Sequence, residues 1–253
     1  MYATKIYGHR GASEYAPENT MEAFKLAYEM GADGIELDVQ LTIDGQLVVI
    51  HDETVDRVSN GVGFVKDMTL GELKSLQFNR THPEYNDVRI PLLEEVLDYF
   101  SHRQFLINIE LKNSVFPNEG LEAMTLMLVK KYGMLERTIF SSFNHFSMRK
   151  VAALEPMAQT AFLTSEIQAN VKRYLQENQT SIYHPADSLL ERSDLLTGMP
   201  QEQDVITDLQ KSGIRINTWT VNSGKQMRNL CNRGVDGIIT NKPDLGSEIR
   251  DDD

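Results

Sequence analysis

The fold is decided by residues 7–52, which read YGHRGASEYAPENTMEAFKLAYEMGADGIELDVQLTIDGQLVVIHD. A short β-rich run from Ala3 to Tyr7 leads into this stretch, and an apolar run from Gly34 to Leu41 lies in its middle. Between the two runs, apolar residues recur at helical spacing after Asn19 and Thr20, either of which is a suitable N-cap. The order strand, helix, strand predicts a β/α unit.

The same alternation of β-rich runs and amphipathic helical stretches returns at Pro91 and continues to Thr240. Together with the first units it gives about eight β/α units in 253 residues, which predicts a closed (β/α)8 TIM barrel. A doubly wound sheet is the alternative, but Gly8-His9-Arg10-Gly11 lacks the GxGxxG spacing with which such a sheet usually opens. Residues 251–253 are expected to fray. The later strands are expected at 105–111, 138–143, 160–163, 181–183, 215–221 and 237–240, and the later helices at 92–100, 121–132, 147–154, 167–177, 204–211 and 225–232.

Residues from Glu53 to Arg89 interrupt this alternation. A tight turn at Asp44-Gly45 and an extended return from Gln46 to Ile50 come before the segment. The segment itself holds a short helix near Thr69 to Leu76, with its first residue as a cap, and is mostly polar. It is too long for a plain loop and too poor in apolar residues for a core of its own. The prediction is one domain over residues 1–253, with an insertion of about 53–89 on one face.

Composition and charge limit the classes of function. With 41% hydrophobic and 25% charged residues, the chain has the composition of an ordinary soluble globular protein. Its net charge of -12 repels nucleic acid and anionic membranes, although a local cationic site can still bind a small anion. The single cysteine, Cys231, favours a reducing compartment. No signal-peptide pattern precedes the first strand, and no apolar stretch reaches the ~20 residues that span a bilayer. We expect a cytoplasmic protein without an integral membrane segment, whose oligomeric state the sequence leaves open.

The polar residues of the predicted strands gather at one kind of position, the carboxyl end of the strand. In a barrel, those ends face the mouth at which active sites are built. A random distribution would also put such residues at strand starts and on helices, so their concentration indicates a functional site. These residues are His9, Arg10, Glu36, Asp38, His51, Glu110, Lys112 and Trp219.

The carboxylates of this set have a spacing that suits a metal ion. Glu36 and Asp38 are two residues apart, so both project from one face of a strand, roughly 6–7 Å apart along it. Glu110 and Lys112 repeat the spacing on a later strand. Three carboxylates at a barrel mouth repel one another unless a cation lies between them, and oxygen ligands favour Mg²⁺ or Ca²⁺ over zinc. The alternative is a pair of structural ion pairs, Glu36 with Arg10 and Glu110 with Lys112.

Two histidines and two positive side chains complete the set. His9 and His51 are the candidates for proton transfer near neutral pH. Arg10 and Lys112 place fixed positive charge beside the proposed cation. A cation, two positive side chains and an acid/base pair suit a reaction in which negative charge grows in the transition state, and phosphoryl transfer is the obvious case.

The only tryptophan, Trp219, is either a core residue or an apolar wall for the carbon part of a substrate. The strand end at Ser141-Ser142-Phe143 is a weaker candidate for the same wall. The remaining histidines are expected at loop or helix-edge positions with surface or structural roles: His82, His102, His145 and His184.

The chain resembles the glycerophosphodiester phosphodiesterase family, and the likeness extends over nearly its whole length. Many ordered blocks carry the resemblance, which makes it more specific than one short motif. The blocks are His9-Arg10-Gly11, Ala16-Pro17-Glu18-Asn19-Thr20, Glu36-Leu37-Asp38-Val39, Asp44-Gly45, His51-Asp52, Glu110-Leu111-Lys112, Trp219-Thr220-Val221-Asn222 and Gly234-Val235-Asp236-Gly237-Ile238-Ile239-Thr240. One departure is Asn241, which follows Thr240 where many members carry an aspartate and lies outside the set of candidate site residues.

The resemblance implies a TIM barrel with a small insertion after the second histidine. It also implies hydrolysis of glycerophosphodiesters to sn-glycerol 3-phosphate and an alcohol, assisted by one divalent cation, with a place in lipid and glycerol metabolism. Carried over residue by residue, it implies that Glu36, Asp38 and Glu110 hold the metal, that His9 and His51 act as base and acid, that Arg10 and Lys112 bind the phosphate, and that Trp219 contacts the glycerol.

Several alternatives stay open at this point. The two histidines could exchange roles, and the attacking oxygen could come from water or from the neighbouring glycerol hydroxyl. The sequence does not choose between Mg²⁺ and Ca²⁺ or name the alcohol. A lysophospholipase D-type phosphodiesterase and a non-catalytic phosphodiester-binding module are the related alternatives. A barrel glycosidase with paired carboxylates fits poorly, because aromatic residues for sugar stacking make up only 8% of the chain.

Overall fold

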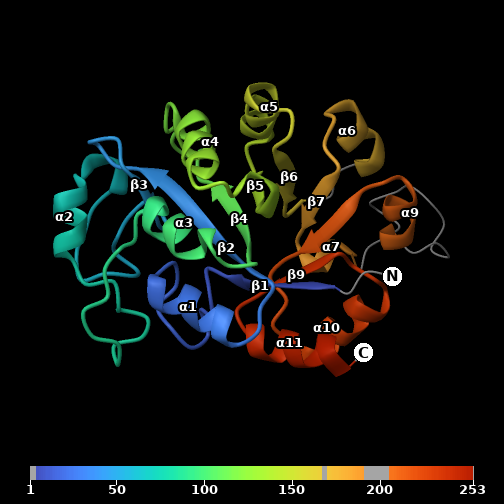
Figure 1. The fold of residues 1–253 in the computed structure, drawn as a ribbon, viewed down its shortest axis with the longest axis horizontal. Helices are drawn as coiled ribbons and strands as arrows, with labels where there is room; N and C mark the ends of the chain where they lie inside the picture. Colours follow the sequence, from blue (N-terminus) through green and yellow to red (C-terminus); the bar gives the residue numbers. More distant parts are fainter. Residues whose placement is uncertain (1–3, 167–169, 191–204, 253) are drawn as a thin grey trace.

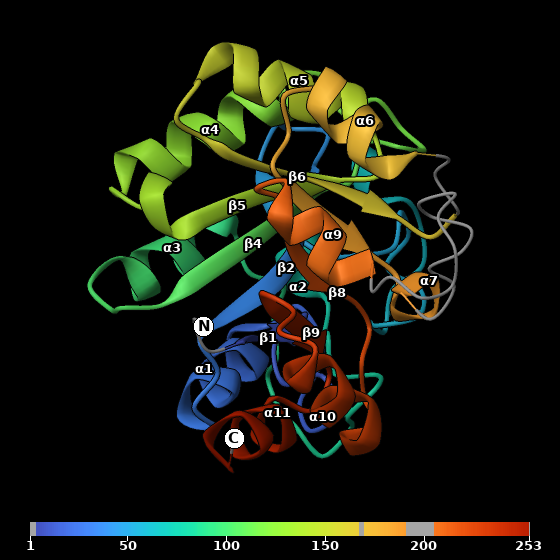
Figure 2. The ribbon, with the colours of Figure 1, turned by 90° about the vertical axis from the view of Figure 1, so that its right-hand side faces the viewer.

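The protein folds as a closed parallel barrel surrounded by helices, as predicted (Figures 1 and 2). The computed structural model describes residues 4–166, 170–190 and 205–252. Within them, eight parallel strands form a ring that closes because β1 pairs with both β2 and β9. The ring strands are β1 (Lys5–His9), β2 (Gly34–Leu41), β4 (Leu106–Leu111), β5 (Thr138–Ser142), β6 (Gln159–Thr164), β7 (Ile182–Pro185), β8 (Arg215–Thr218) and β9 (Gly237–Thr240).

Helices follow most of the ring strands and cover the outside of the barrel (Figure 1). None of those in the described ranges is long and apolar enough to cross a bilayer. The helices are α1 (Met21–Glu29), α2 (Leu70–Ser75), α3 (Leu93–Ser101), α4 (Leu121–Lys131), α5 (His145–Leu154), α6 (Val171–Glu177), α7 (Asp187–Leu190), α9 (Val205–Lys211), α10 (Gly224–Asn232) and α11 (Pro243–Asp252), with 3-10 turns at Val65–Asp67 and Leu135–Arg137.

The first β/α unit is built as its sequence predicts. The side-chain oxygen of Thr20 accepts a hydrogen bond from the backbone N–H of Ala23 and caps α1. The turn between β1 and α1 packs so closely that a Cβ at Gly11 would lie 2.6 Å from the backbone of Ala23, and the φ of Gly11 is +85°. Only glycine fits there. This close packing places His9 and Arg10, the two preceding residues, at the barrel mouth.

The insertion lies between β3 (Leu47–Val49), which pairs antiparallel with β2, and α3. Figure 1 shows it, with α2, at one side of the barrel. Thr69 caps α2 in a capping box with Glu72, as predicted. The prediction that the insertion has no core of its own is wrong. A separate cluster of buried apolar side chains fills it: Val48, Ile50, Val55, Val58, Val65, Leu73, Phe78, Val88 and Ile90.

Several predicted boundaries differ from the structure. The frayed tail predicted at 251–253 is wrong in part, because residues 251 and 252 complete α11, which buries Ile249. Strand β8 ends at Thr218, so Trp219 follows the strand. β7 continues past its predicted end, so His184 lies on a strand and is fully buried instead of lying in a loop. Parts of the predicted helices 167–177 and 204–211, at 167–169 and 204, fall outside the described residues.

Substitution of a buried valine in the insertion tests whether its cluster is a true core. Val65→Ala should lower the free energy of local opening of the insertion by about 2 kcal/mol, because the change removes buried methyl groups and leaves a cavity. Val62 is 76% exposed and three residues away, so Val62→Ala should change that free energy by less than about 0.5 kcal/mol. Hydrogen exchange of peptides from residues 53–89 measures both values. Equal effects of the two substitutions would show that the cluster does not stabilise the insertion.

Candidate active site

A polar pocket opens at the carboxyl end of the barrel, where the strand-end residues converge. All but two of the eight strand-end residues line it directly; the others, Asp38 and Lys112, contact lining residues or one another. One side of the pocket carries charged groups and the other is apolar. The lining residues are His9, Arg10, Glu36, His51, Asn108, Glu110, Phe143, Leu163, Trp219 and Ile239.

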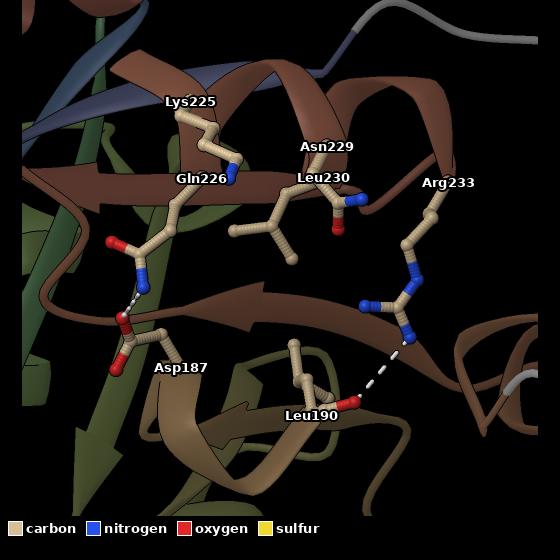
Figure 3. Close-up of a pocket in the computed structure, with 7 residues that line it drawn as sticks. All are labelled: Asp187, Leu190, Lys225, Gln226, Asn229, Leu230 and Arg233. Carbon is tan, nitrogen blue, oxygen red and sulfur yellow. Dashed lines mark hydrogen bonds between the residues drawn. The ribbon is translucent and has the colours of Figure 1, made fainter. Parts of the chain in front are cut away.

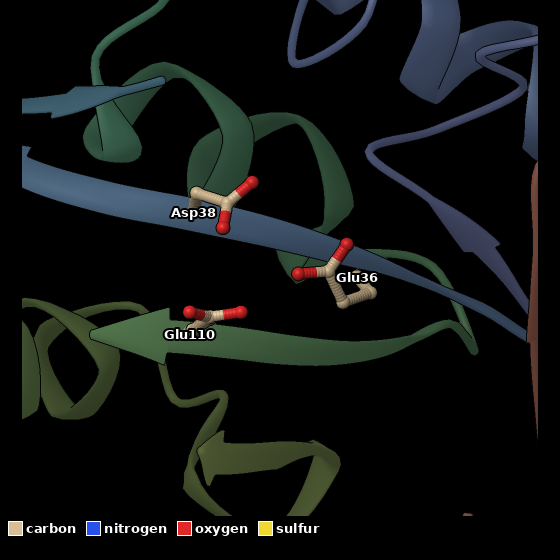
Figure 4. Close-up of side chains that lie close together, drawn as sticks. All are labelled: Glu36, Asp38 and Glu110. Carbon is tan, nitrogen blue, oxygen red and sulfur yellow. The ribbon is translucent and has the colours of Figure 1, made fainter. Parts of the chain in front are cut away.

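Three buried carboxylates form the centre of the charged side (Figure 4). Glu36 and Asp38 project from β2, and the strand register places Asp38 directly beside Glu110 on β4. Each of the three contributes one oxygen to a group whose members all lie within 4.8 Å of one another. The convergence that the spacing predicted is therefore present in the structure.

Burial and mutual repulsion govern the protonation of this cluster. Burial and the charges of Asp38 and Glu110 raise the pKa of Glu36 well above its usual value. Burial and Asp38 likewise raise the pKa of Glu110. Burial also opposes the ionisation of Asp38, but Lys112 and Arg10 outweigh it and hold the pKa of Asp38 below its usual value. Ionisation of the two glutamates is thus disfavoured in the protein alone, and a bound cation would favour it.

One oxygen of the cluster has no hydrogen-bond partner. Asp38 Oδ2 accepts a hydrogen bond from the side-chain amide of Asn19 at 2.8 Å, whereas Asp38 Oδ1 is buried and accepts none. Lys112 Nζ, at 3.8 Å, lies beyond hydrogen-bond distance of this oxygen, and a buried anionic oxygen without a hydrogen bond is costly. Asp38 belongs to the group formed with Glu36 and Glu110, and a set of carboxylate donors suits a hard divalent cation. The residues present therefore fit a Mg²⁺ or Ca²⁺ ion.

Arg10 and Lys112 lie against the carboxylates. Arg10 Nε is 3.5 Å from Asp38 Oδ2, and the backbone N–H of Arg10 donates to Glu36 Oε2 at 3.0 Å. Lys112 Nζ is 2.9 Å from Glu110 Oε1 and 3.8 Å from Asp38 Oδ1. The ion pair of Glu110 with Lys112 is present, but the Arg10 side chain pairs with Asp38 and Glu18 instead of Glu36. Two positive side chains therefore face three carboxylates.

The two candidate histidines have different partners. His9 Nδ1 donates to Asn241 Oδ1 at 2.7 Å, and its Nε2 lies 4.0 Å from Glu36 Oε2. Burial and the charge of Arg10 lower the pKa of His9 to about 4, so this imidazole is neutral near pH 7. His51 Nδ1 donates to the carboxylate of Asp52 at 2.7 Å. In both rings the Nδ1 contact leaves Nε2 free to exchange a proton with a substrate.

Two residues that the sequence interpretation did not assign to the site contact its members, and a third, Arg57, reaches Arg10 and His51 through carboxylates. Asn19, expected only as a possible helix cap, hydrogen-bonds Asp38. Asn241, the departure noted in the sequence, hydrogen-bonds His9. Arg57, in the insertion, forms ion pairs with Glu18 and Asp52. Asn19 belongs to a sequence block that carries the family resemblance, which could have indicated its role, but no sequence pattern indicated Arg57.

Trp219 belongs to the apolar side of the pocket. Its indole N–H donates to the backbone oxygen of His184 at 2.8 Å, which fixes the ring at the end of β8. The ring meets the edge of Phe143 with centroids 5.6 Å apart, and Leu163 lines the same side. The structure thus places both aromatic candidates where an apolar wall was expected.

A larger cavity, of about 310 Å³, lies between α7 and α10 (Figure 3). Its lining includes Lys225 and Asn229 of α10, and a hydrogen bond from Gln226 to Asp187 crosses it. None of the predicted site residues lines this cavity. Size therefore does not distinguish the barrel mouth from this cavity, and the chemistry of the barrel mouth is what makes it the candidate active site.

Comparison with known proteins agrees with the geometry. The model of the "Glycerophosphoryl diester phosphodiesterase family" matches residues 9–245. A glycerophosphodiester phosphodiesterase of Caldanaerobacter subterraneus subsp. tengcongensis is 42% identical over 246 residues, which cover 95% of each chain. The crystal structure of such an enzyme from Agrobacterium tumefaciens is similar with a TM-score of 0.82 at 29% identity, over 97% of this chain and 99% of that one. An Oleispira antarctica phosphodiesterase in complex with the product sn-glycerol-3-phosphate is similar with a TM-score of 0.82 at 27% identity, over 98% of this chain and 97% of that one.

The carboxylate cluster predicts a metal-dependent melting temperature. Mg²⁺ or Ca²⁺ should raise the Tm, because a ligand of the folded state stabilises it. The pKa values of Glu36 and Glu110 are raised, so protons occupy the cluster at low pH and leave as the pH rises. The metal-induced rise in Tm should therefore grow as the pH rises above the usual pKa range of a glutamate. Differential scanning fluorimetry measures this rise.

Two aspartate variants provide the control for this experiment. Asp38→Asn should remove most of the rise in Tm, because it replaces one of the three carboxylates of the cluster. Asp67→Asn should keep it, because Asp67 is exposed, lies outside the cluster and forms an ion pair with the neighbouring Lys66. A rise that survives Asp38→Asn, or that shrinks with increasing pH, would contradict the assignment of the cluster as a cation site.

Proposed function

The chain belongs to the glycerophosphoryl diester phosphodiesterase family and is an enzyme of that activity, and we propose that its hydrolysis of glycerophosphodiesters relies on one divalent cation and on His9 and His51. The products are sn-glycerol 3-phosphate and an alcohol. The observation that carries the proposal is the meeting of three buried carboxylates with two histidines and two positive side chains at one pocket. A glycosidase needs only the carboxylates and leaves the rest of this arrangement without a use.

Glu36, Asp38 and Glu110 are the residues that would hold the cation. When bound, it supplies a positive charge that polarises the phosphodiester and stabilises negative charge on its oxygens. The carboxylate donor set supports Mg²⁺ or Ca²⁺, both of which prefer oxygen ligands.

Arg10 and Lys112 would bind the non-bridging oxygens of the phosphodiester. Arg10 lines the pocket, which supports a contact between its guanidinium group and the substrate. Lys112 Nζ has three protons, and Glu110 accepts one of them. Because both side chains are held by carboxylates, they are positioned before the substrate arrives, and such preorganised charge stabilises a transition state most effectively.

His9 suits the role of base and His51 the role of acid. Neutral His9 can accept a proton at Nε2 from the attacking oxygen, which belongs to water or to the adjacent glycerol hydroxyl. The attacking oxygen then forms a bond to phosphorus while the bond from phosphorus to the alcohol oxygen breaks. His51 Nε2 donates a proton to that departing oxygen. Asp52 supports this role because it accepts from Nδ1 of His51 and fixes the orientation of the ring.

The roles of the two histidines can be distinguished by changing the leaving group of the substrate. On glycerophosphocholine, His9→Ala and His51→Ala should each lower kcat by about 10²- to 10⁴-fold. On the p-nitrophenyl ester of glycerol 3-phosphate, His51→Ala should lose far less, because nitrophenolate departs without a proton. His9→Ala should lose equally on both esters. Steady-state kinetics with excess metal measures the four values.

Two results would change the proposal. The reverse pattern, with His9→Ala spared on the nitrophenyl ester, would exchange the roles of the histidines. A near-normal rate for either variant on glycerophosphocholine would remove that histidine from the mechanism.

Trp219 is proposed to contact the glycerol part of the substrate. It is the only tryptophan of the chain, so intrinsic fluorescence reports on this pocket alone. Titration with sn-glycerol 3-phosphate should change the emission, because the ligand displaces water from the exposed part of the indole. The same titration of Lys112→Met should require more ligand, since a phosphate contact is lost. An unchanged emission at product concentrations that inhibit turnover would place Trp219 outside the binding site.

The lysophospholipase D-type alternative has one observation in its favour. Exposed apolar side chains occur in the segments that follow the site residues His51 and Lys112: Val62 and Phe64 in the insertion, and Val115 beside Phe116. The rings of Phe64 and Phe116 pack edge to face with centroids 5.7 Å apart. Turnover of a panel of glycerophosphodiesters and lysophospholipids, run with each metal, decides between the two substrate classes.

A further inference from the structure

Arg57 connects the insertion to the active site through two carboxylates. Its Nη1 and Nη2 donate to both oxygens of Glu18, at 2.6 and 2.8 Å. Its Nε and Nη2 donate to both oxygens of Asp52, at 2.7 and 3.0 Å. Each contact uses two hydrogen bonds, an arrangement that the planar guanidinium of arginine provides and that fixes the orientation of both partners. Burial opposes the ionisation of Asp52, but Arg57 and His51 hold its pKa at about 2.

Each of these carboxylates holds one of the proposed site residues. Glu18 Oε1 also accepts a hydrogen bond from Arg10 Nη1 at 2.8 Å, and Arg10 is the proposed phosphate ligand. Asp52 Oδ1 also accepts from His51 Nδ1 at 2.7 Å, and His51 is the proposed acid. The guanidinium of Arg57 therefore lies between two chains of contacts, one leading to each residue.

We propose that Arg57 is a positioning residue for the reaction. Through Asp52 it keeps the proton on Nδ1 of His51 and directs Nε2 toward the departing oxygen. Through Glu18 it directs Arg10 toward the phosphate. This inference rests on the proposed function, because it assigns Arg57 to the same site. It also gives the insertion a part in catalysis.

A purely structural role for Arg57 predicts a different result. Its side chain is 44% exposed, and an exposed ion pair usually contributes no more than about 1 kcal/mol to stability. The side chains of the other arginines of the insertion make hydrogen bonds within the insertion itself. Arg89 binds the backbone oxygens of Ser75 and Leu76 and the carboxylate of Asp87, and it contacts no site residue. Arg89 is thus a matched control for the integrity of the insertion.

The test compares Arg57→Met with Arg89→Met at saturating metal. Arg57→Met should lower kcat on glycerophosphocholine by about 10- to 100-fold, the usual effect of removing a residue that orients a site group. The loss should be smaller on the p-nitrophenyl ester, because the part that acts through His51 is not needed there. KM should rise on both esters through Arg10. Arg89→Met should leave kcat and KM near those of the wild type. Arg57→Lys keeps the positive charge but loses the planar guanidinium group, so its kcat should lie between those of Arg57→Met and the wild type.

A double-mutant cycle isolates the contact with Asp52. If Arg57 acts through Asp52, the variant carrying both Arg57→Met and Asp52→Asn should be little slower than Asp52→Asn alone. Multiplicative losses, or equal losses on both esters, would overturn the positioning role. If Arg57→Met unfolds, the cycle is run with Arg57→Lys, which decides by the same criterion.

The outcome separates this inference from the proposed function. A wild-type rate for Arg57→Met, together with an inactive His51→Ala, overturns the role of Arg57 and leaves the histidine mechanism in place. A wild-type rate for His51→Ala overturns the mechanism itself, and with it the role assigned to Arg57.

Discussion

The site depends on the repulsion among three buried carboxylates, Glu36, Asp38 and Glu110, at the mouth of the barrel. Burial makes their charges costly, and their closeness adds to that cost. Arg10 and Lys112 offset only two of the three possible negative charges. The imbalance that remains is unfavourable for the protein alone, and the divalent cation proposed above would relieve it. The electrostatic strain of the cluster is thus the physical basis of the proposed cation site.

The surrounding contacts hold this charged centre in a single arrangement. Asn19 orients Asp38 from the turn before α1, and Asn241 reaches His9 from the end of β9. The insertion contributes Arg57 from outside the ring of strands. The contacts of Asn19 and Asn241 also satisfy polar groups of Asp38 and His9 that burial would otherwise penalise. The parts of the chain that meet at the mouth are therefore held together by the same hydrogen bonds that orient the reacting groups.

The sequence predicts those features that depend on a strand or on the ends of neighbouring strands. The i, i+2 spacing of Glu36 and Asp38 sets their common face, and the parallel order of the strands brings Glu110 beside them. The contacts of Arg57 are not predictable in this way, because they join loop segments that belong to no pair of neighbouring strands. Asn241 directly follows β9, the neighbour of β1, so its place beside His9 depends on the closure of the ring between strands 232 residues apart. The core of the insertion was not predicted from the sequence because part of it consists of apolar residues from β3 and the chain that follows it.

The two kinds of contact have different requirements during folding. The carboxylate cluster needs only β2 beside β4, which are neighbours in the ring and are separated along the chain by β3, the insertion and α3. The partner of His9 arrives with the residue that follows β9, the last strand to be synthesised. A refolding chain can therefore assemble its carboxylate cluster before it can form the contact between His9 and Asn241. Metal uptake would report the pairing of two strands, and the first turnover would report the closure of the ring.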